Sequence, residues 1–256
     1  MRELAGAIDR FPAMRRIPGL DWRAVLARDA ARIEAMTPDE WAMSIAGRAK
    51  PFYSVMPDDI WKGRPCFIVG GGPSLVGFNF RRLKGHRMIA INRAFEFVPD
   101  ADILFSIDSY YFRESVKRTE TDPRRFAGFK VWLDMHGYPF CDIYLVQSNG
   151  ENGLSTSIAS GLYHGSNSGY AAINLAVCLR ADPIYLLGFD MNFSGPRSHF
   201  HSGYALRTKL EKVKRYIGNF NGLAVQLQER GIKVVNLSPK SALGCFEKKS
   251  IDEVLP

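Results

Sequence analysis

The stretch Cys66-Phe-Ile-Val-Gly-Gly-Gly-Pro-Ser-Leu75 constrains the fold of this chain more than any other segment. Its first four residues form a short apolar run, which is typical of a buried strand. Three consecutive glycines follow, and glycine permits positive φ and a close approach of the backbone to a ligand. If a helix comes next, its free N–H groups and its dipole form an anion site. The segment therefore predicts a strand that ends in a nucleotide or sugar-phosphate pocket, with a ligand-free turn as the alternative.

Short apolar, β-branched runs alternate with helical patterns from Pro65 onward. Runs that are apolar throughout suit strands covered on both faces, as in parallel sheets. The predicted strands are Cys66–Val69, Met88–Ile91, Ile103–Ile107, Lys130–Leu133, Ile143–Val146, Ile184–Leu187 and Lys233–Leu237, and the clearest predicted helices are Ser168–Arg180 and Leu206–Arg230. This β-α-β order predicts the α/β class, with a Rossmann-like, doubly wound, mostly parallel sheet that has helices on both faces.

The chain is expected to divide into an N-terminal helical extension, residues 1–60, and a Rossmann-like nucleotide-binding domain, residues 61–256. Thr37-Pro-Asp-Glu40 is a capping box with proline at the first helical position. An earlier helix is expected to start near Asp21. The pattern leaves open whether this extension packs on the sheet or mediates assembly, for example as a homo-oligomer.

Composition excludes some classes of protein and leaves the partner open. No apolar run approaches the roughly 18 residues that span a bilayer, and no secretory signal is visible, so we expect a cytoplasmic protein without a membrane span. Its four cysteines are widely spaced, without a metal-ligand pattern. Lys and Arg number 34 against 26 Asp and Glu, a net charge of +8. This surplus favours anionic partners, namely nucleotides, acidic sugars, nucleic acid or a membrane surface, without choosing among them.

One long segment, Ser148–Asn167, is rich in glycine, serine and asparagine. Loops of this length inside compact domains are usually functional or disordered. Two interpretations stay open for it, a mobile flap over a ligand and a plain surface loop.

Residues just past the strand ends of an open α/β sheet face its ligand crevice. This rule selects as candidate nucleotide-binding residues Gly70, Gly71, Gly72, Pro73, Ser74, Asn92, Asp108, Asn167, Ser168 and Gly169. The amide of Asn92 is expected either to bind a base, ribose or phosphate or to cap its turn. Ser168 is a natural helix N-cap, a role compatible with phosphate binding.

Two carboxylates and two histidines are the candidates for chemistry. Asp108 and Asp190 each follow a buried strand, where an unpaired carboxylate is costly. Together they could hold magnesium, which prefers oxygen ligands, or one of them could bind a sugar hydroxyl or orient a histidine. His199 and His201 flank Phe200 in a polar loop, and an imidazole titrates near ~6.5, so either can act as a general base.

Six motifs, taken in order, resemble those of a known enzyme family. They are Gly70-Gly-Gly-Pro-Ser-Leu75, Ala90-Ile-Asn-Arg-Ala-Phe95, Asn167-Ser-Gly169, Ile184-Tyr-Leu-Leu-Gly-Phe-Asp190, Ser198-His-Phe-His201 and Asn236-Leu-Ser-Pro-Lys-Ser-Ala-Leu243. The set resembles the bacterial CMP-sialic-acid-dependent sialyltransferases. It is also similar to the 6-hydroxymethylpterin-diphosphokinase-like family, many of whose members are encoded by phages and prophages. Both resemblances cover about Pro65 to Leu243.

The sialyltransferase resemblance implies transfer from a CMP-sugar donor to a glycan or anionic acceptor, with inversion and without a metal or further cofactor. It implies that Gly70–Leu75, Asn92 and Asn167–Gly169 hold the cytidine monophosphate. Asp190 would lie near the ribose or sugar, and His201 or His199 would be the base.

The chain departs from that family at two places. The family has asparagine where Gly71 stands. Its phosphate-contacting tyrosines follow the G-x-D, where this chain has Met191-Asn-Phe193. Tyr204 or Arg197 would have to substitute for them.

Two alternatives remain from the same residues. The pterin-kinase resemblance implies magnesium-dependent pyrophosphate transfer from ATP, with Asp108 and Asp190 as metal ligands. The other is a non-catalytic protein of phage origin that retains the pocket and binds another protein or nucleic acid through its basic surface.

Overall fold

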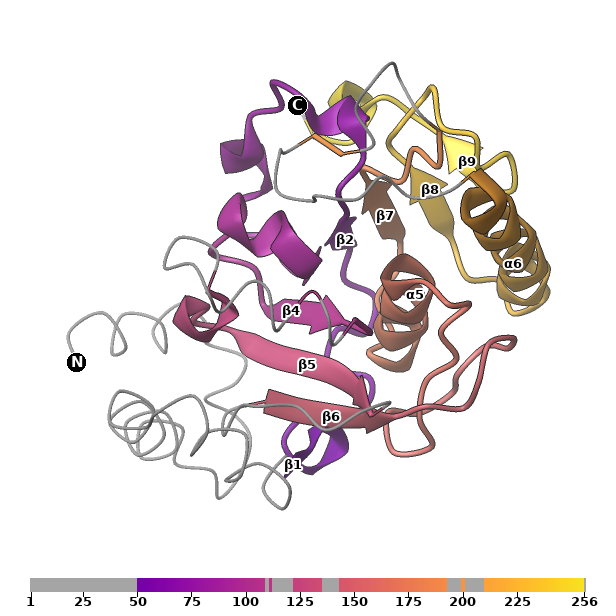
Figure 1. The fold of residues 1–256 in the computed structure, drawn as a ribbon. Helices are drawn as coiled ribbons and strands as arrows, with labels where there is room; N and C mark the ends of the chain where they lie inside the picture. Colours follow the sequence, from indigo (N-terminus) through magenta and orange to yellow (C-terminus); the bar gives the residue numbers. More distant parts are fainter. Residues whose placement is uncertain are drawn as a thin grey trace.

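The computed structural model of the chain describes residues 50–108, 111, 122–134, 143–192, 199–200 and 210–255. These residues form one nine-stranded sheet whose paired strands are all parallel, in the order β1-β6-β5-β4-β3-β2-β7-β8-β9 (Figure 1). The strands are β1 (Lys50–Pro51), β2 (Cys66–Val69), β3 (Arg87–Ile91), β4 (Ile103–Ser106), β5 (Phe129–Asp134), β6 (Ile143–Gln147), β7 (Ile184–Leu187), β8 (Val234–Asn236) and β9 (Glu247–Lys248).

The winding of the sheet reverses at β2. Strands β3 to β6 are added on one side of β2 and strands β7 to β9 on the other. Val69, the last residue of β2, pairs with Ala90 of β3 and with Leu187 of β7. The structure thus confirms the predicted doubly wound α/β fold. In such folds ligands bind outside the carboxyl ends of the strands at this reversal, which here is the glycine bend, Gly70–Ser74.

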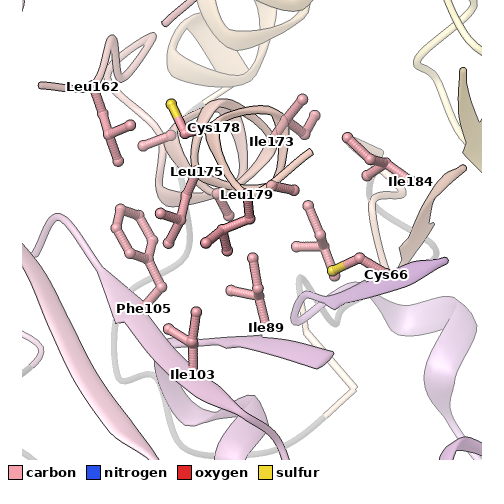
Figure 2. Close-up of a cluster of buried hydrophobic side chains, with 14 of the residues drawn as sticks. Cys66, Ile89, Ile103, Phe105, Leu162, Ile173, Leu175, Cys178, Leu179 and Ile184 are labelled. Atoms are coloured by element: carbon pink, nitrogen blue, oxygen red, sulfur yellow. The ribbon is translucent and has the colours of Figure 1, made fainter. Parts of the chain in front are cut away.

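Two α-helices of the described residues, α5 (Ser168–Cys178) and α6 (Leu210–Glu229), pack with one face of the sheet (Figure 1). Figure 2 shows Leu175 and Leu179 of the α5 segment above Ile89 and Phe105 of the sheet. Nearly every residue of α5 is buried, because the helix is covered both by the sheet and by neighbouring segments. The predicted helix Ser168–Arg180 is therefore confirmed, with its end two residues earlier.

The opposite face of the sheet is covered by short 3₁₀ helices. Their apolar residues Leu75, Leu83 and Phe95 join Phe67 and Leu104 in a second buried cluster. These helices are η3 (Pro73–Leu75), η4 (Phe80–Leu83) and η5 (Asn92–Glu96), and three others are η2 (Phe52–Ser54), η7 (Pro123–Arg125) and η8 (Ile251–Glu253). Because both faces are covered, the central strands β2 and β7 are apolar throughout, as their sequences indicate.

The predicted division of the chain at residue 60 stays a prediction, because residues 1–49 lie outside the described residues. Before that boundary, β1 pairs with β6 at the edge of the sheet. Phe52 and Met56 are buried in the same core cluster as α5. The segment 50–60 therefore packs into the sheet.

The long segment predicted as either a flap or a surface loop is a packed loop. Asn149 N–H donates to Leu162 O over 2.9 Å, and Leu162 N–H donates to Gln147 O over 2.8 Å, which closes the base of the loop. Ser155 N–H donates to the side chain of Asn174 on α5 over 2.6 Å. Leu154 and Leu162 are buried. These contacts favour the surface-loop interpretation, with the loop fixed to α5.

Among the described helices, none combines the length and the apolar character that crossing a bilayer requires.

The aromatic core under α6 leads to a first prediction. Phe220 is fully buried, and its ring lies 5.8 Å from that of Tyr170, 6.2 Å from that of Phe189 and 6.2 Å from that of Phe246. We expect Phe220→Ala to lower the free energy of unfolding by about 3–5 kcal/mol, because it leaves a cavity. Val225→Ala, at an exposed position of the same helix, is the control and should change it by less than ~0.5 kcal/mol. Equal stability of the two variants in urea unfolding would show that α6 is not anchored through Phe220.

Candidate active site

The glycine bend lies directly against the end of β7. Gly70 N–H donates to Leu187 O and Gly72 N–H donates to Gly188 O, each over 2.8 Å. A Cβ added to Gly72 would stand 1.9 Å from Asp190 Oδ2 and 2.5 Å from Gly188 O. None of the three glycines of the bend has a positive φ, whereas Gly188 has a φ of 68°. Glycine is therefore required at Gly72 because of the close approach to β7, and the positive φ that glycine permits is not used in the bend.

Asp190 binds Ser74, the last residue of the bend. Its Oδ1 accepts a hydrogen bond from Ser74 N–H at 3.1 Å and its Oδ2 accepts one from Ser74 Oγ at 2.8 Å. Ser74 Oγ also lies 3.0 Å from Ser238 Oγ. The Asp190 side chain is buried, and burial raises the pKa of its carboxyl group while the two hydrogen bonds from Ser74 oppose that rise. Both carboxylate oxygens thus hold the bend in place.

The segment after β8 fixes the end of β7 from the other side. Phe189 O accepts hydrogen bonds from Asn236 Nδ2 at 3.2 Å and from Ser241 Oγ at 2.6 Å. Ala242 N–H donates to Asp190 O over 2.7 Å. Sequence reasoning gave Asn236 and Ser241 no individual role. Both lie in the motif Asn236–Leu243, one of the six motifs that resemble those of the sialyltransferases.

Most hydrogen-bonding groups of the glycine bend serve to build it. The N–H groups of Gly70, Gly72 and Ser74 all donate to the end of β7. The bend leads into the three-residue 3₁₀ helix Pro73–Leu75, and no α-helix follows it directly. The anion site expected from a following helix is therefore not formed there, and the role of Gly70–Ser74 in nucleotide binding stays a prediction.

Asn92 lies beside the bend, immediately after β3. It has a φ of 51°, which is uncommon for a residue other than glycine. Its buried Oδ1 accepts no hydrogen bond from any described residue. Leaving a buried acceptor unsatisfied costs about 1–3 kcal/mol, and such strain and unmet bonding gather at functional sites. A ligand N–H or O–H group would satisfy this oxygen, and the role of Asn92 in ligand binding stays a prediction.

The first turn of α5 is capped by a neighbouring side chain. Asn167 is the N-cap, and its Oδ1 accepts hydrogen bonds from Gly169 N–H at 2.8 Å and Tyr170 N–H at 3.3 Å. Ser168, predicted as the N-cap, is instead the first helical residue, and its Oγ accepts from Ile107 N–H after β4 at 3.2 Å. A Cβ on Gly169 would stand 2.6 Å from the Phe189 ring. These residues join α5 to two strand ends, and their contact with a nucleotide stays a prediction.

The two candidate carboxylates do not form one metal site. Asp108 is exposed after β4, where its Oδ1 accepts from Tyr111 N–H at 3.0 Å, and Asp190 is buried after β7. Strands β4 and β7 are three positions apart in the sheet, which is about 14 Å. A magnesium ion binds its ligands at about 2 Å, so one ion cannot join both carboxylates. The described residues also hold no group of three or more His, Cys, Asp or Glu suited to a metal ion.

His199 lies over the glycine bend. Its ring Cδ2 stands 2.8 Å from the position that a Cβ on Gly71 would take, and Phe200 N–H donates to Gly71 O over 2.9 Å. Burial lowers the pKa of His199, which keeps its imidazole neutral at pH 7. A neutral imidazole can accept a proton. The second candidate base, His201, lies outside the described residues, as do Arg197 and Tyr204.

Comparison with known proteins yields structural likenesses only. No protein-family model and no curated protein matches the chain. The chain is similar to the sialyltransferase CstII from Campylobacter jejuni, in complex with the substrate analogue CMP-3FNeuAc, at 15% identity and a TM-score of 0.44 over 73% of this chain and 86% of that chain. A variant of the alpha-2,3/8-sialyltransferase CstII is 16% identical, with a TM-score of 0.38 over 73% of this chain and 87% of that chain. A mammalian sialyltransferase is 9% identical, with a TM-score of 0.37 over 91% of this chain and 85% of that chain. Likenesses of this extent assign neither a family nor an activity.

The crowding at Gly72 leads to a second prediction. Gly72→Ala should lower the free energy of unfolding by about 3 kcal/mol, because the new methyl group meets a backbone carbonyl that cannot rotate away. Gly218→Ala is the control, since a Cβ there meets nothing within 4 Å. In the middle of α6 it should raise stability by up to about 1 kcal/mol. Chemical unfolding measures both, and a Gly72→Ala protein as stable as the wild type would mean that the bend and β7 are not in contact.

Proposed function

We propose that this chain is a nucleotide-sugar-dependent glycosyltransferase that uses a CMP-type donor and a glycan hydroxyl as acceptor. The observation that carries the proposal is the contact of the His199 ring with Gly71, at the reversal of the sheet. A candidate base thus stands where doubly wound folds bind their ligands. The six motifs that resemble the CMP-sialic-acid-dependent sialyltransferases favour CMP as the nucleotide.

The reaction needs a base and a leaving group on opposite sides of the sugar. His199, neutral because of burial, takes the proton from the acceptor hydroxyl as that oxygen attacks the anomeric carbon. The new bond joins the acceptor oxygen to this carbon, and the bond from the carbon to the phosphate oxygen breaks. CMP leaves with the bonding electrons, and attack from the opposite face inverts the anomeric configuration.

The donor nucleotide is expected beside Asn92. The unsatisfied Oδ1 of Asn92 suits the amino group of a cytosine or a ribose hydroxyl, both of which are hydrogen-bond donors. Asp190 acts in this proposal as a positioning residue, because its two carboxylate oxygens already accept hydrogen bonds from Ser74. Its effect on catalysis would pass through the shape of the bend that carries Gly71.

Magnesium-dependent pyrophosphate transfer is less well supported. It would need carboxylates that converge on one ion, whereas Asp108 and Asp190 follow strands about 14 Å apart. We therefore expect sugar transfer to continue in EDTA. Loss of activity in the chelator, restored by magnesium, would favour the phosphoryl-transfer alternative.

A third prediction tests the base directly. His199→Ala should lower kcat by a factor of about 10² to 10⁴ and leave the affinity for CMP within about threefold, because a base acts mainly in the transition state. His86→Ala is the matched control, since His86 lies directly before β3, at the amino ends of the strands and away from the glycine bend. Parallel losses of turnover and CMP binding in the His199 variant would contradict the assignment. If His201→Ala alone removes turnover, the base is His201.

The pH dependence gives a fourth prediction. Because burial lowers the pKa of His199, the imidazole should stay deprotonated to a pH below its ordinary value of about 6.5. The acid limb of kcat should therefore lie below about pH 6.5 and reflect protonation of the base. A pH profile of kcat measures this limb. An acid limb above pH 7 would be incompatible with a buried histidine base.

A further inference from the structure

Four phenylalanine rings gather next to the glycine bend. Phe97 and Phe200 have ring centroids 4.6 Å apart, and Phe80 lies 5.6 Å from each of them. Phe78 lies 5.1 Å from Phe80. We call this group, which comprises Phe78, Phe80, Phe97 and Phe200, the phenylalanine platform. Phe78 and Phe80 follow the glycine bend in the chain, Phe97 follows the 3₁₀ helix η5, and Phe200 follows His199.

The platform is only partly buried. Phe97 is 36% exposed, and Val76, in the segment between the bend and Phe78, is 57% exposed. Phe78, Phe80 and Phe200 pack against the second core cluster and keep part of their surface accessible. A cluster of exposed aromatic side chains marks a binding surface more often than scattered apolar residues do.

The position of the platform connects it to the proposed chemistry. Phe200 follows His199 in the chain, and its N–H donates to Gly71 O over 2.9 Å. The platform therefore begins one residue from the candidate base. A base must lie within hydrogen-bond reach of the hydroxyl that it deprotonates. A hydroxyl that His199 deprotonates therefore lies close to the segment that carries Phe200, and an acceptor bound there can extend over the platform.

We infer that the phenylalanine platform is the acceptor subsite and that it binds the C–H face of a neutral sugar ring. The inference rests on the proposed function and specifies its acceptor. The face of a phenyl ring carries negative charge, which attracts polarised C–H groups. The four rings offer no hydrogen-bonding group, so the platform holds the sugar by its apolar face while His199 selects the hydroxyl. In this arrangement the nucleotide lies next to Asn92, apart from the acceptor.

The test separates acceptor binding from donor binding. Wild type, Phe97→Ala, Phe97→Tyr and the control Val225→Ala, exposed on α6, are given CMP-N-acetylneuraminic acid and a panel of simple galactosides that includes lactose. We expect Phe97→Ala to raise the acceptor KM about tenfold, which is the usual effect of one aromatic contact. The donor KM, the rate of donor hydrolysis in water and the affinity for CMP should change less than twofold. Phe97→Tyr, which keeps the ring, and Val225→Ala should behave as the wild type.

Three outcomes overturn the inference. An unchanged acceptor KM in Phe97→Ala, with transfer intact, excludes the platform as acceptor subsite and leaves the proposed function standing. A raised donor KM or weakened CMP binding would mean that the rings stack on the nucleobase. A wild-type protein that neither binds CMP nor transfers sugar refutes the proposed function and removes the inference with it. If Phe97→Ala does not fold, as judged by thermal unfolding, Phe97→Leu takes its place, because it keeps the apolar bulk and loses the ring.

Discussion

The rest of the candidate site depends on the close approach of the glycine bend to the end of β7. There is room for no side chain at Gly72, since an added Cβ would stand 1.9 Å from Asp190 Oδ2. Two consequences follow from this contact. Ser74 reaches both oxygens of Asp190, and Gly71 lies where its carbonyl accepts from Phe200 N–H. The loop that carries the candidate base is thereby fixed to the strand at which the sheet reverses.

The polar residues around this contact divide into two groups. Asp190, Asn167 and Ser168 use their side-chain oxygens for hydrogen bonds inside the protein, so their first role is to shape the site. Asn92 and Asn192 differ from them, because the buried Oδ1 of each accepts nothing from the described residues. Both follow strands that neighbour β2. The unmet acceptor of Asn92, next to the bend, supports the proposal that a ligand donor group binds there.

The sequence predicted the sheet well and the site in part. Short apolar runs bounded by turn residues, such as Cys66–Val69 and Ile184–Leu187, favour buried parallel strands, and both occur with the predicted bounds. The glycine bend was also expected, and the close backbone approach that glycine permits explains it, here toward β7. The partner of Asp190 could not be predicted, because Ser74 lies 116 residues away and only the strand order brings them together. The edge strands β1 and β9 were missed because two residues carry no periodic pattern.

We propose that the reversal of the sheet at the glycine bend is a nucleotide site. Titration of ¹⁵N-labelled protein with CMP, followed by two-dimensional amide NMR, tests it most directly. If CMP binds at the bend, saturable shifts should be largest for the amides of Gly71, Asn92 and His199, with α6 residues such as Val225 unaffected. Shifts that gather elsewhere on the molecule, or no shifts at millimolar CMP, would contradict it.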